Sequence, residues 1–192
     1  MSIRLRLSGH SFSKASAPKP ESGRGVTVEL LSMRSMLIPS ANVTSDVESL
    51  LSSMEFGGVV VDRESEDVVI ITPEGKMAAL VVVPSSLIDE LNELYTPEAI
   101  AYTSPILKCG NKGDYEVVIS LREDLMVIKV FADGGVIFCD MYEYSGQDDV
   151  LYRLARLSAV FDIPLYTINI YGGTKNLLNL LLKYYKDVHL CE

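Results

Sequence analysis

Apolar and polar residues alternate over short segments from the start of the chain. Residues 3–7 read IRLRL, so apolar and basic side chains change at every position. A period of two is typical of a strand with one buried face. We expect a return strand over residues 11–15, with Phe12 pointing inward, and a third strand over residues 26–33. Residues 15–25 are rich in proline, glycine and charge, and this composition predicts a mobile loop.

The rest of the first half mixes helix and strand patterns. Residues 44–54 carry apolar side chains at helical spacing, and Ser45 and Glu48 have the spacing of a capping box. Residues 85–95 show a second helical pattern with leucines on one face. Continuous apolar runs between turn signals predict buried strands. These runs cover residues 58–62, 67–73 and 76–84.

The second half begins again with hairpins and continues with helix-linked strands. Asp133-Gly134 is the strongest hairpin signal in the chain. Ser145 is the candidate cap of the helix that follows, and Asp148 and Asp149 lie in its first turn, where the helix dipole favours acidic groups. We expect strands over residues 115–121, 125–131, 136–144 and 165–171, helices over residues 147–161 and 174–185, and a last short segment over residues 188–190.

The two halves show the same order of elements. Each runs through three strands joined by turns or loops, then a helix, then another strand. Residues 96–114 form a connector with two prolines and with glycines near its end, so we place a boundary within it. Mixed hairpins and helix-linked strands predict an α/β fold with two mixed-sheet lobes flanking a cleft. The expected lobes are residues 1–105 and 106–192.

Composition narrows the classes of function. The 192 residues are 48% hydrophobic, which is enough for two small lobes. The net charge of −9 argues against a general nucleic-acid binder. The three cysteines (Cys109, Cys139 and Cys191) are odd in number and far apart, so neither a zinc site nor a disulfide framework is indicated. No apolar run approaches the roughly 20 residues that cross a bilayer, and the N-terminus lacks the apolar core of a signal peptide. We expect a cytoplasmic protein without membrane insertion.

Several segments resemble actin-like ATPases, the superfamily of sugar kinases, heat-shock 70 proteins and actin. Residues 2–13 are similar to its first phosphate hairpin. Residues 117–155 resemble the second-lobe hairpin and helix of the bacterial pilus-assembly and cell-division actin homologues, and residues 168–181 resemble their adenosine-side strand, glycine pair and helix. Through residues 81–90 and 147–154, the chain resembles more closely an uncharacterised bacterial family of this fold. The resemblance implies a duplicated actin-like, ribonuclease H-like fold.

The acidic positions of that superfamily are replaced in this chain. Two carboxylates near the hairpins serve a magnesium nucleotide and its attacking water, because Mg²⁺ prefers oxygen ligands. Residues 7–9, which match the Asp-x-Gly motif, read Leu-Ser-Gly. The second motif falls near Ser120 and Arg122, while Glu123 and Asp124 lie at a turn tip where a solvated role is expected. We therefore predict no catalytic residue, no metal ligand and no hydrolysis.

A nucleotide could still bind without being hydrolysed. A glycine pair between a strand and a helix lets the backbone approach a ligand, and amides at a helix start can meet an anion. The structural alternative is that the pair only turns the chain. The candidate ligand-contacting residues are Gly9, His10, Gly172, Gly173, Thr174 and Lys175. The five leucines of the last helix exceed one helical face, so it is either wholly buried or part of a subunit contact.

Three functions remain open at this point. The first is a degenerate, non-catalytic actin-like protein that binds a protein partner, with a homodimer as a further arrangement. The second is an ATP-binding switch or ATPase that uses the cleft between the lobes. The third is a small-ligand sensor that uses the same cleft.

Overall fold

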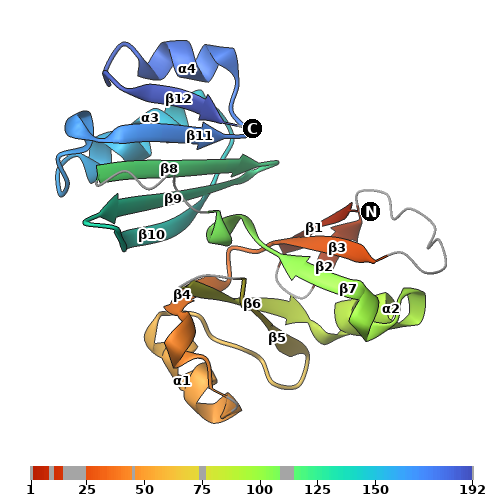
Figure 1. Ribbon diagram of the computed structural model, residues 1–192. Coiled ribbons are helices and arrows are strands. Elements are labelled where there is room, and N and C mark those ends of the chain that lie inside the picture. Colours follow the sequence, from red (N-terminus) through yellow and green to blue (C-terminus); the bar gives the residue numbers. More distant parts are fainter. Residues whose placement is uncertain are drawn as a thin grey trace. The chain divides into compact units, whose positions relative to one another are not determined.

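A computed structural model describes residues 2–8, 11–14, 25–44, 46–73, 77–108 and 115–191 (Figure 1). The chain divides into two compact units, Met1–Leu107 and Lys108–Glu192. The expected mobile loop over residues 15–25 lies almost wholly outside the described residues, as do Gly9 and His10.

The first unit contains a four-stranded mixed sheet. Its strands are β1 (Ser2–Ser8), β2 (Ser11–Lys14), β3 (Val26–Leu31) and β7 (Ile100–Thr103). The order is β2-β1-β3-β7; β1 pairs antiparallel with β2 and parallel with β3, and β3 pairs parallel with β7. The period-two prediction for β1 is confirmed, because every second residue is buried: Ile3, Leu5 and Leu7.

A second sheet of the first unit is wholly antiparallel. Its strands are β4 (Ser35–Pro39), β5 (Glu66–Ile71) and β6 (Met77–Pro84), in the order β4-β6-β5. Helix α1 (Val47–Phe56) buries Leu50 and Met54 against this sheet. Helix α2 (Ser85–Leu94) follows β6 directly and buries Leu87 and Leu91, whereas Leu94 is 40% exposed. Short 3-10 turns occupy Ser40–Asn42, Pro97–Ala99 and Pro105–Leu107.

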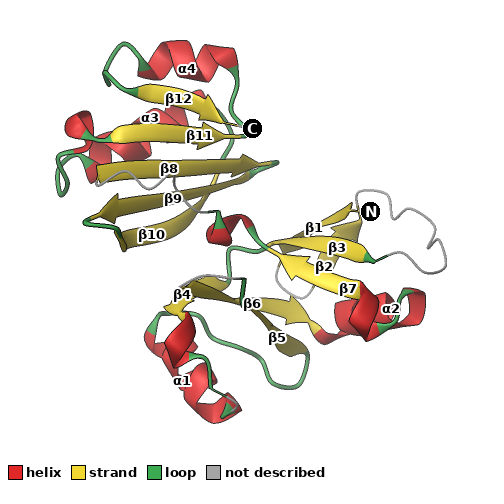
Figure 2. Cartoon of the chain, viewed as in Figure 1, coloured by secondary structure: helices red, strands yellow, loops and turns green. Residues whose placement is uncertain are grey.

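The second unit is one five-stranded mixed sheet with helices on it (Figure 2). The elements are β8 (Tyr115–Arg122), β9 (Leu125–Ala132), β10 (Gly135–Glu143), α3 (Gln147–Leu157), a 3-10 turn (Ile163–Leu165), β11 (Thr167–Tyr171), α4 (Lys175–Leu181) and β12 (Val188–Cys191). The strand order is β10-β9-β8-β11-β12; β9 pairs antiparallel with β10 and with β8, and β11 pairs parallel with β8 and with β12. Side chains from one face of the sheet and from both helices form a single core.

One predicted strand of the first half is wrong, and two strands were missed. The apolar run over residues 58–62 is not a strand. Gly57 and Gly58 end α1, and in the irregular segment that follows Val59 and Val61 pack against the core of the three-stranded sheet. The strands β4 and β7 were not predicted, since neither has a long apolar run of its own. Pairing partners that are distant in sequence decide these segments.

Two helix starts also differ from the prediction. The N-cap of α1 is Asp46, whose carboxylate accepts from the Glu48 N–H at 3.2 Å; Ser45 lies outside the described residues. The N-cap of α3 is Gly146 rather than Ser145, and α3 ends at Leu157. The Asp133-Gly134 hairpin is confirmed, because both residues have positive φ (51° and 74°) and join paired Ala132 and Gly135, as a two-residue primed turn requires.

The start of α3 gives a first testable expectation. One carboxylate oxygen of Asp149 accepts from the Ser145 N–H at 2.8 Å, the Ser145 hydroxyl at 2.8 Å and the Gly146 N–H at 3.1 Å. These bonds, led by the Ser145 amide, lower the pKa of Asp149. Asp149→Asn is therefore expected to lower the melting temperature at pH 7.

The pH dependence of this loss follows from the direction of the shift. A carboxyl whose pKa is lower in the folded state stabilises above its unfolded pKa of about 3.9, and the contribution disappears as the pH falls through the folded value. The melting difference between wild type and Asp149→Asn should accordingly vanish in acid. Asp148→Asn, an equal charge change in the same turn, is the control and should alter the melting temperature less at pH 7. Equal effects of the two variants would contradict the capping role.

Candidate functional site

The turn between β11 and α4 holds four of the predicted site residues. Gly172 follows the strand with φ of +75°, a left-handed conformation that favours glycine. The Thr174 hydroxyl caps α4 by accepting from the Leu177 N–H at 3.2 Å. Thr174 and Lys175 are exposed. A ligand-binding role for these residues stays a prediction.

Both glycines of the turn are required by contacts within the unit itself. A Cβ on Gly172 would lie 2.2 Å from the Leu121 carbonyl oxygen and 2.7 Å from Nη1 of Arg122. A Cβ on Gly173 would lie 2.6 Å from Cγ2 of Ile170. The hairpin end of β8 thus fills the space beside Gly172, and close packing of the chain accounts for the glycine pair.

The second acidic motif of the superfamily was expected near Ser120 and Arg122, at the end of β8. Ser120 is 1% exposed, and its hydroxyl has no hydrogen-bond partner among the residues that the structure describes. The Arg122 guanidinium donates to the Leu121 carbonyl at 2.9 Å. Glu123, with φ of 55°, and Asp124 form the exposed hairpin tip. The two acidic groups of this segment therefore lie beyond the strand end, at the solvated turn.

At the other predicted position, Leu7 is 5% exposed and belongs to the buried face of β1. Its neighbours Gly9 and His10 lie outside the described residues. The position that matches the superfamily's first aspartate is therefore an apolar core position here.

Sequence reasoning missed a buried polar network on the second-unit sheet. Glu116 and Asn169 are 1% and 3% exposed, and the Asn169 amide donates to the Glu116 carboxylate. The Cys191 thiol donates to the Asn169 side-chain oxygen at 3.5 Å. Lys129, also buried, donates to the Lys108 carbonyl. The sequence signal was a charged or amide residue within each of three largely apolar strands. The strand register, which the sequence does not give, then places Lys129 and Asn169 on either side of Val118.

Cys139, which pairs with Lys129 across β10 and β9, has an unreactive thiol. Burial raises the pKa of Cys139 to about 11, with only partial opposition from Lys129. Such a thiol stays protonated at neutral pH and is a poor nucleophile. Within the described ranges, no group of three histidine, cysteine, aspartate or glutamate side chains could hold a metal ion.

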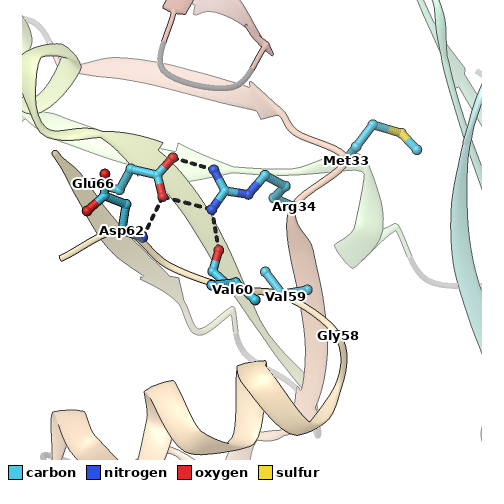
Figure 3. A pocket seen from close by; sticks show the side chains of 7 residues that line it. All are labelled: Met33, Arg34, Gly58, Val59, Val60, Asp62 and Glu66. Atoms are coloured by element: carbon cyan, nitrogen blue, oxygen red, sulfur yellow. Dashed lines mark hydrogen bonds and ion pairs between the residues drawn. The ribbon is translucent and has the colours of Figure 1, made fainter.

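A hollow of about 480 Å³ in the first unit was also missed (Figure 3). Its polar end is a bidentate ion pair between Arg34 and Glu66, one bond of which measures 2.7 Å. The same guanidinium donates to the Val60 carbonyl, and Glu66 accepts from the Asp62 N–H at 2.9 Å. The hollow is lined by Met33, Arg34, Gly58, Val59, Val60, Asp62 and Glu66.

The polar groups of this hollow satisfy one another. The Glu66 side chain is fully buried, while that of Arg34 is 34% exposed. The hydrogen bond that Arg34 donates to Glu66 raises the pKa of Arg34 above its already high value. The Asp62 carboxylate accepts from the Glu64 N–H at 3.1 Å and the Ser65 hydroxyl at 2.7 Å. The arrangement fastens the irregular segment after α1 to the start of β5.

No family profile and no curated protein matches the chain. Solved structures do. A Bacteroides thetaiotaomicron protein with an actin-like ATPase fold and unknown function matches with a TM-score of 0.67 and 16% identity, over 99% of this chain and 90% of the other. A chain of the PilM–PilN type IV pilus biogenesis complex matches with a TM-score of 0.50 and 11% identity, over 99% and 87%.

The cytoplasmic domain of EpsL, from the type II secretion system of Vibrio cholerae, gives a TM-score of 0.42 and 12% identity, over 100% and 85%. That value is too low for an argument about fold. The stronger likenesses define the class: the chain has the actin-like ATPase fold. At these identities they establish the fold alone. In the part of the chain that the structure describes, no helix is long and apolar enough to span a bilayer.

Proposed function

We propose that this chain is a non-catalytic actin-like protein that acts in the cytoplasm by binding a protein partner. One observation carries the proposal. The two positions at which the superfamily pattern places acidic groups hold Leu7 and Ser120, which are 5% and 1% exposed. A buried leucine and a buried serine supply no carboxylate to a magnesium nucleotide.

The glycine turn supports the same conclusion. The Leu121 carbonyl and the Arg122 guanidinium lie against Gly172, so the close approach that glycine permits is used by the hairpin. The fold likeness to a chain of the PilM–PilN type IV pilus biogenesis complex favours a protein partner, because that structure is a complex of two proteins.

We further propose that the two units are the duplicated lobes of the fold. The strands β2-β1-β3-β7 of the first and β9-β8-β11-β12 of the second pair in the same way: one antiparallel contact, then two parallel contacts. The three-stranded sheet and α1 lie within the first lobe's sequence as an insertion between β3 and β7.

Thermal unfolding with and without millimolar Mg-ATP tests the proposed function. A ligand at a hundred times its Kd stabilises the folded state by about 2.7 kcal/mol, which moves the melting temperature by several degrees. We expect no magnesium-dependent shift and no release of inorganic phosphate. ATP with EDTA and magnesium without nucleotide are the controls.

A clear upward shift that needs magnesium would instead establish the alternative, an ATP-binding switch or ATPase. Exposed Thr174 and Lys175 would then be the first residues to substitute. In the last leucine-rich segment Leu177 and Leu181 are buried, whereas Leu182 is 46% exposed and is available for a subunit contact. Light scattering on the purified chain tests separately whether it forms a homodimer.

A further inference from the structure

Helix α3 carries two arginines that lie close to tyrosine rings. The Arg153 guanidinium carbon lies 4.0 Å from the ring centroid of Tyr142, on β10, and 5.5 Å from that of Tyr152. The Arg156 guanidinium lies 6.0 Å from the Tyr152 centroid and donates to its hydroxyl at 3.2 Å. These four residues are called the α3 arginine surface below. Tyr152 is 54% exposed, Arg156 is exposed and Arg153 half-buried.

Neither guanidinium of this surface forms an ion pair. Over the described ranges, neither Arg153 nor Arg156 is within ion-pair distance of a carboxylate. Asp149, four residues before Arg153, interacts with it electrostatically, but its bonded oxygen is engaged at the helix start. Asp140 interacts with the Tyr142 hydroxyl. In a chain with 26 acidic and 17 basic residues, two neighbouring unpaired guanidiniums are a local exception.

The hydrogen bonding of the tyrosines fits this arrangement. The Arg156 hydrogen bond lowers the pKa of Tyr152, while burial and then the Asp140 hydrogen bond raise the pKa of Tyr142. Arg153 thus lies close to the Tyr142 ring, and Arg156 is held by its hydrogen bond to the Tyr152 hydroxyl. The N–H edges of a guanidinium are the part of arginine that binds carboxylates in pairs of parallel hydrogen bonds.

Stacking also reduces the entropy that binding costs. A free arginine side chain loses about 2 kcal/mol of rotamer entropy when it is fixed, and a guanidinium already held on a ring loses less. Tyrosine and arginine are the residues most enriched in the energetically dominant parts of protein interfaces. A surface with two arginines beside two tyrosines, of which Tyr152 and Arg156 are exposed, is therefore suited to a polar partner of opposite charge.

We infer that the α3 arginine surface docks an acidic segment of a protein partner, with carboxylates bound by the guanidiniums of Arg153 and Arg156. The inference rests on the proposed protein-binding function and adds the chemistry of the partner. Because a nucleic-acid backbone and an acidic peptide are both polyanions, a decathymidine oligomer is the comparison ligand in the test.

Fluorescence anisotropy with a fluorescein-labelled decaglutamate peptide at low salt tests this surface. Wild type should bind the peptide, and Arg153→Gln/Arg156→Gln should bind at least tenfold more weakly. The matched control is Lys183→Gln/Lys186→Gln, which removes the same charge from exposed positions of the same unit and should stay within twofold of wild type. Arg153→Lys/Arg156→Lys keeps the charge without the stacked fork and should bind at least threefold more weakly.

The outcomes separate this inference from the proposed function. Absent binding by wild type, equal weakening in the lysine control, or tighter binding of a decathymidine oligomer would each overturn the docking surface. None of these binding results bears on whether Mg-ATP shifts the melting temperature. The proposed function is therefore judged by thermal unfolding with Mg-ATP alone. Circular dichroism and melting of each variant show that the change in binding is not a loss of fold.

Discussion

Replacing Gly172 by alanine should destabilise the second unit strongly. Two costs combine at this position. A left-handed conformation costs an L-residue about 1–2 kcal/mol, and φ at Gly172 is +75°. The new Cβ would also lie 2.2 Å from the Leu121 carbonyl oxygen, a backbone atom that cannot rotate away. Overpacking of this kind costs about 1–3 kcal/mol. We expect a total loss of about 3 kcal/mol.

A matched variant separates the two costs. Gly134→Ala has nearly the same conformation, with φ of +74°, but nothing lies within 4 Å of its added Cβ. It should lose only the conformational part, about 1 kcal/mol. In a unit of this size 1 kcal/mol corresponds to about 4–8 °C, so scanning calorimetry should show a fall of more than about 10 °C for Gly172→Ala and about 5 °C for Gly134→Ala.

Similar falls for both variants would show that the clash with the hairpin is relieved by movement. The turn would then have room beside it, and the structural explanation for the glycine pair would be lost. This measurement therefore also bears on whether Gly172 is kept for packing or for a ligand.

Replacing Arg34 by methionine should have the second large effect. The substitution keeps an apolar stem but removes the guanidinium that forms a bidentate ion pair with Glu66, and the Glu66 side chain is fully buried. Breaking a buried ion pair from one side typically costs about 3–5 kcal/mol, because a charge is left without compensation. We expect a loss at the lower end, about 3 kcal/mol, since Arg34 itself is partly exposed. Urea denaturation at pH 7 measures it.

Two further variants give this result its meaning. Arg34→Met/Glu66→Gln removes both charges and should recover about half of the loss, because a neutral amide is cheaper to bury than a carboxylate. Arg63→Met breaks the exposed ion pair with Glu48 and should change the unfolding midpoint little. If the double variant is no more stable than Arg34→Met, packing of the arginine stem and not charge explains the loss.

Local patterns were sufficient for much of the fold. Period-two alternation located β1, and largely apolar runs located β6, β8 and β9, because strands buried in a sheet are built mainly from apolar residues. The Asp133-Gly134 turn was predictable, since few other dipeptides accept two positive φ angles. The resemblance to actin-like ATPases, carried by short motifs, agrees with the fold that the structural likenesses show.

The sequence by itself thus determined the class of fold and most of the strands and helices, because periodicity and turn chemistry act over a few neighbouring residues. Tertiary structure decided what those patterns leave open. The apolar segment after α1 packs against the core of a sheet instead of joining it as a strand, and Arg34 forms an ion pair with Glu66, 32 residues away. Arg153 reaches Tyr142 across an element boundary, and Gly172 meets the end of another hairpin. Such contacts depend on which segments pack together, and no local pattern encodes that choice.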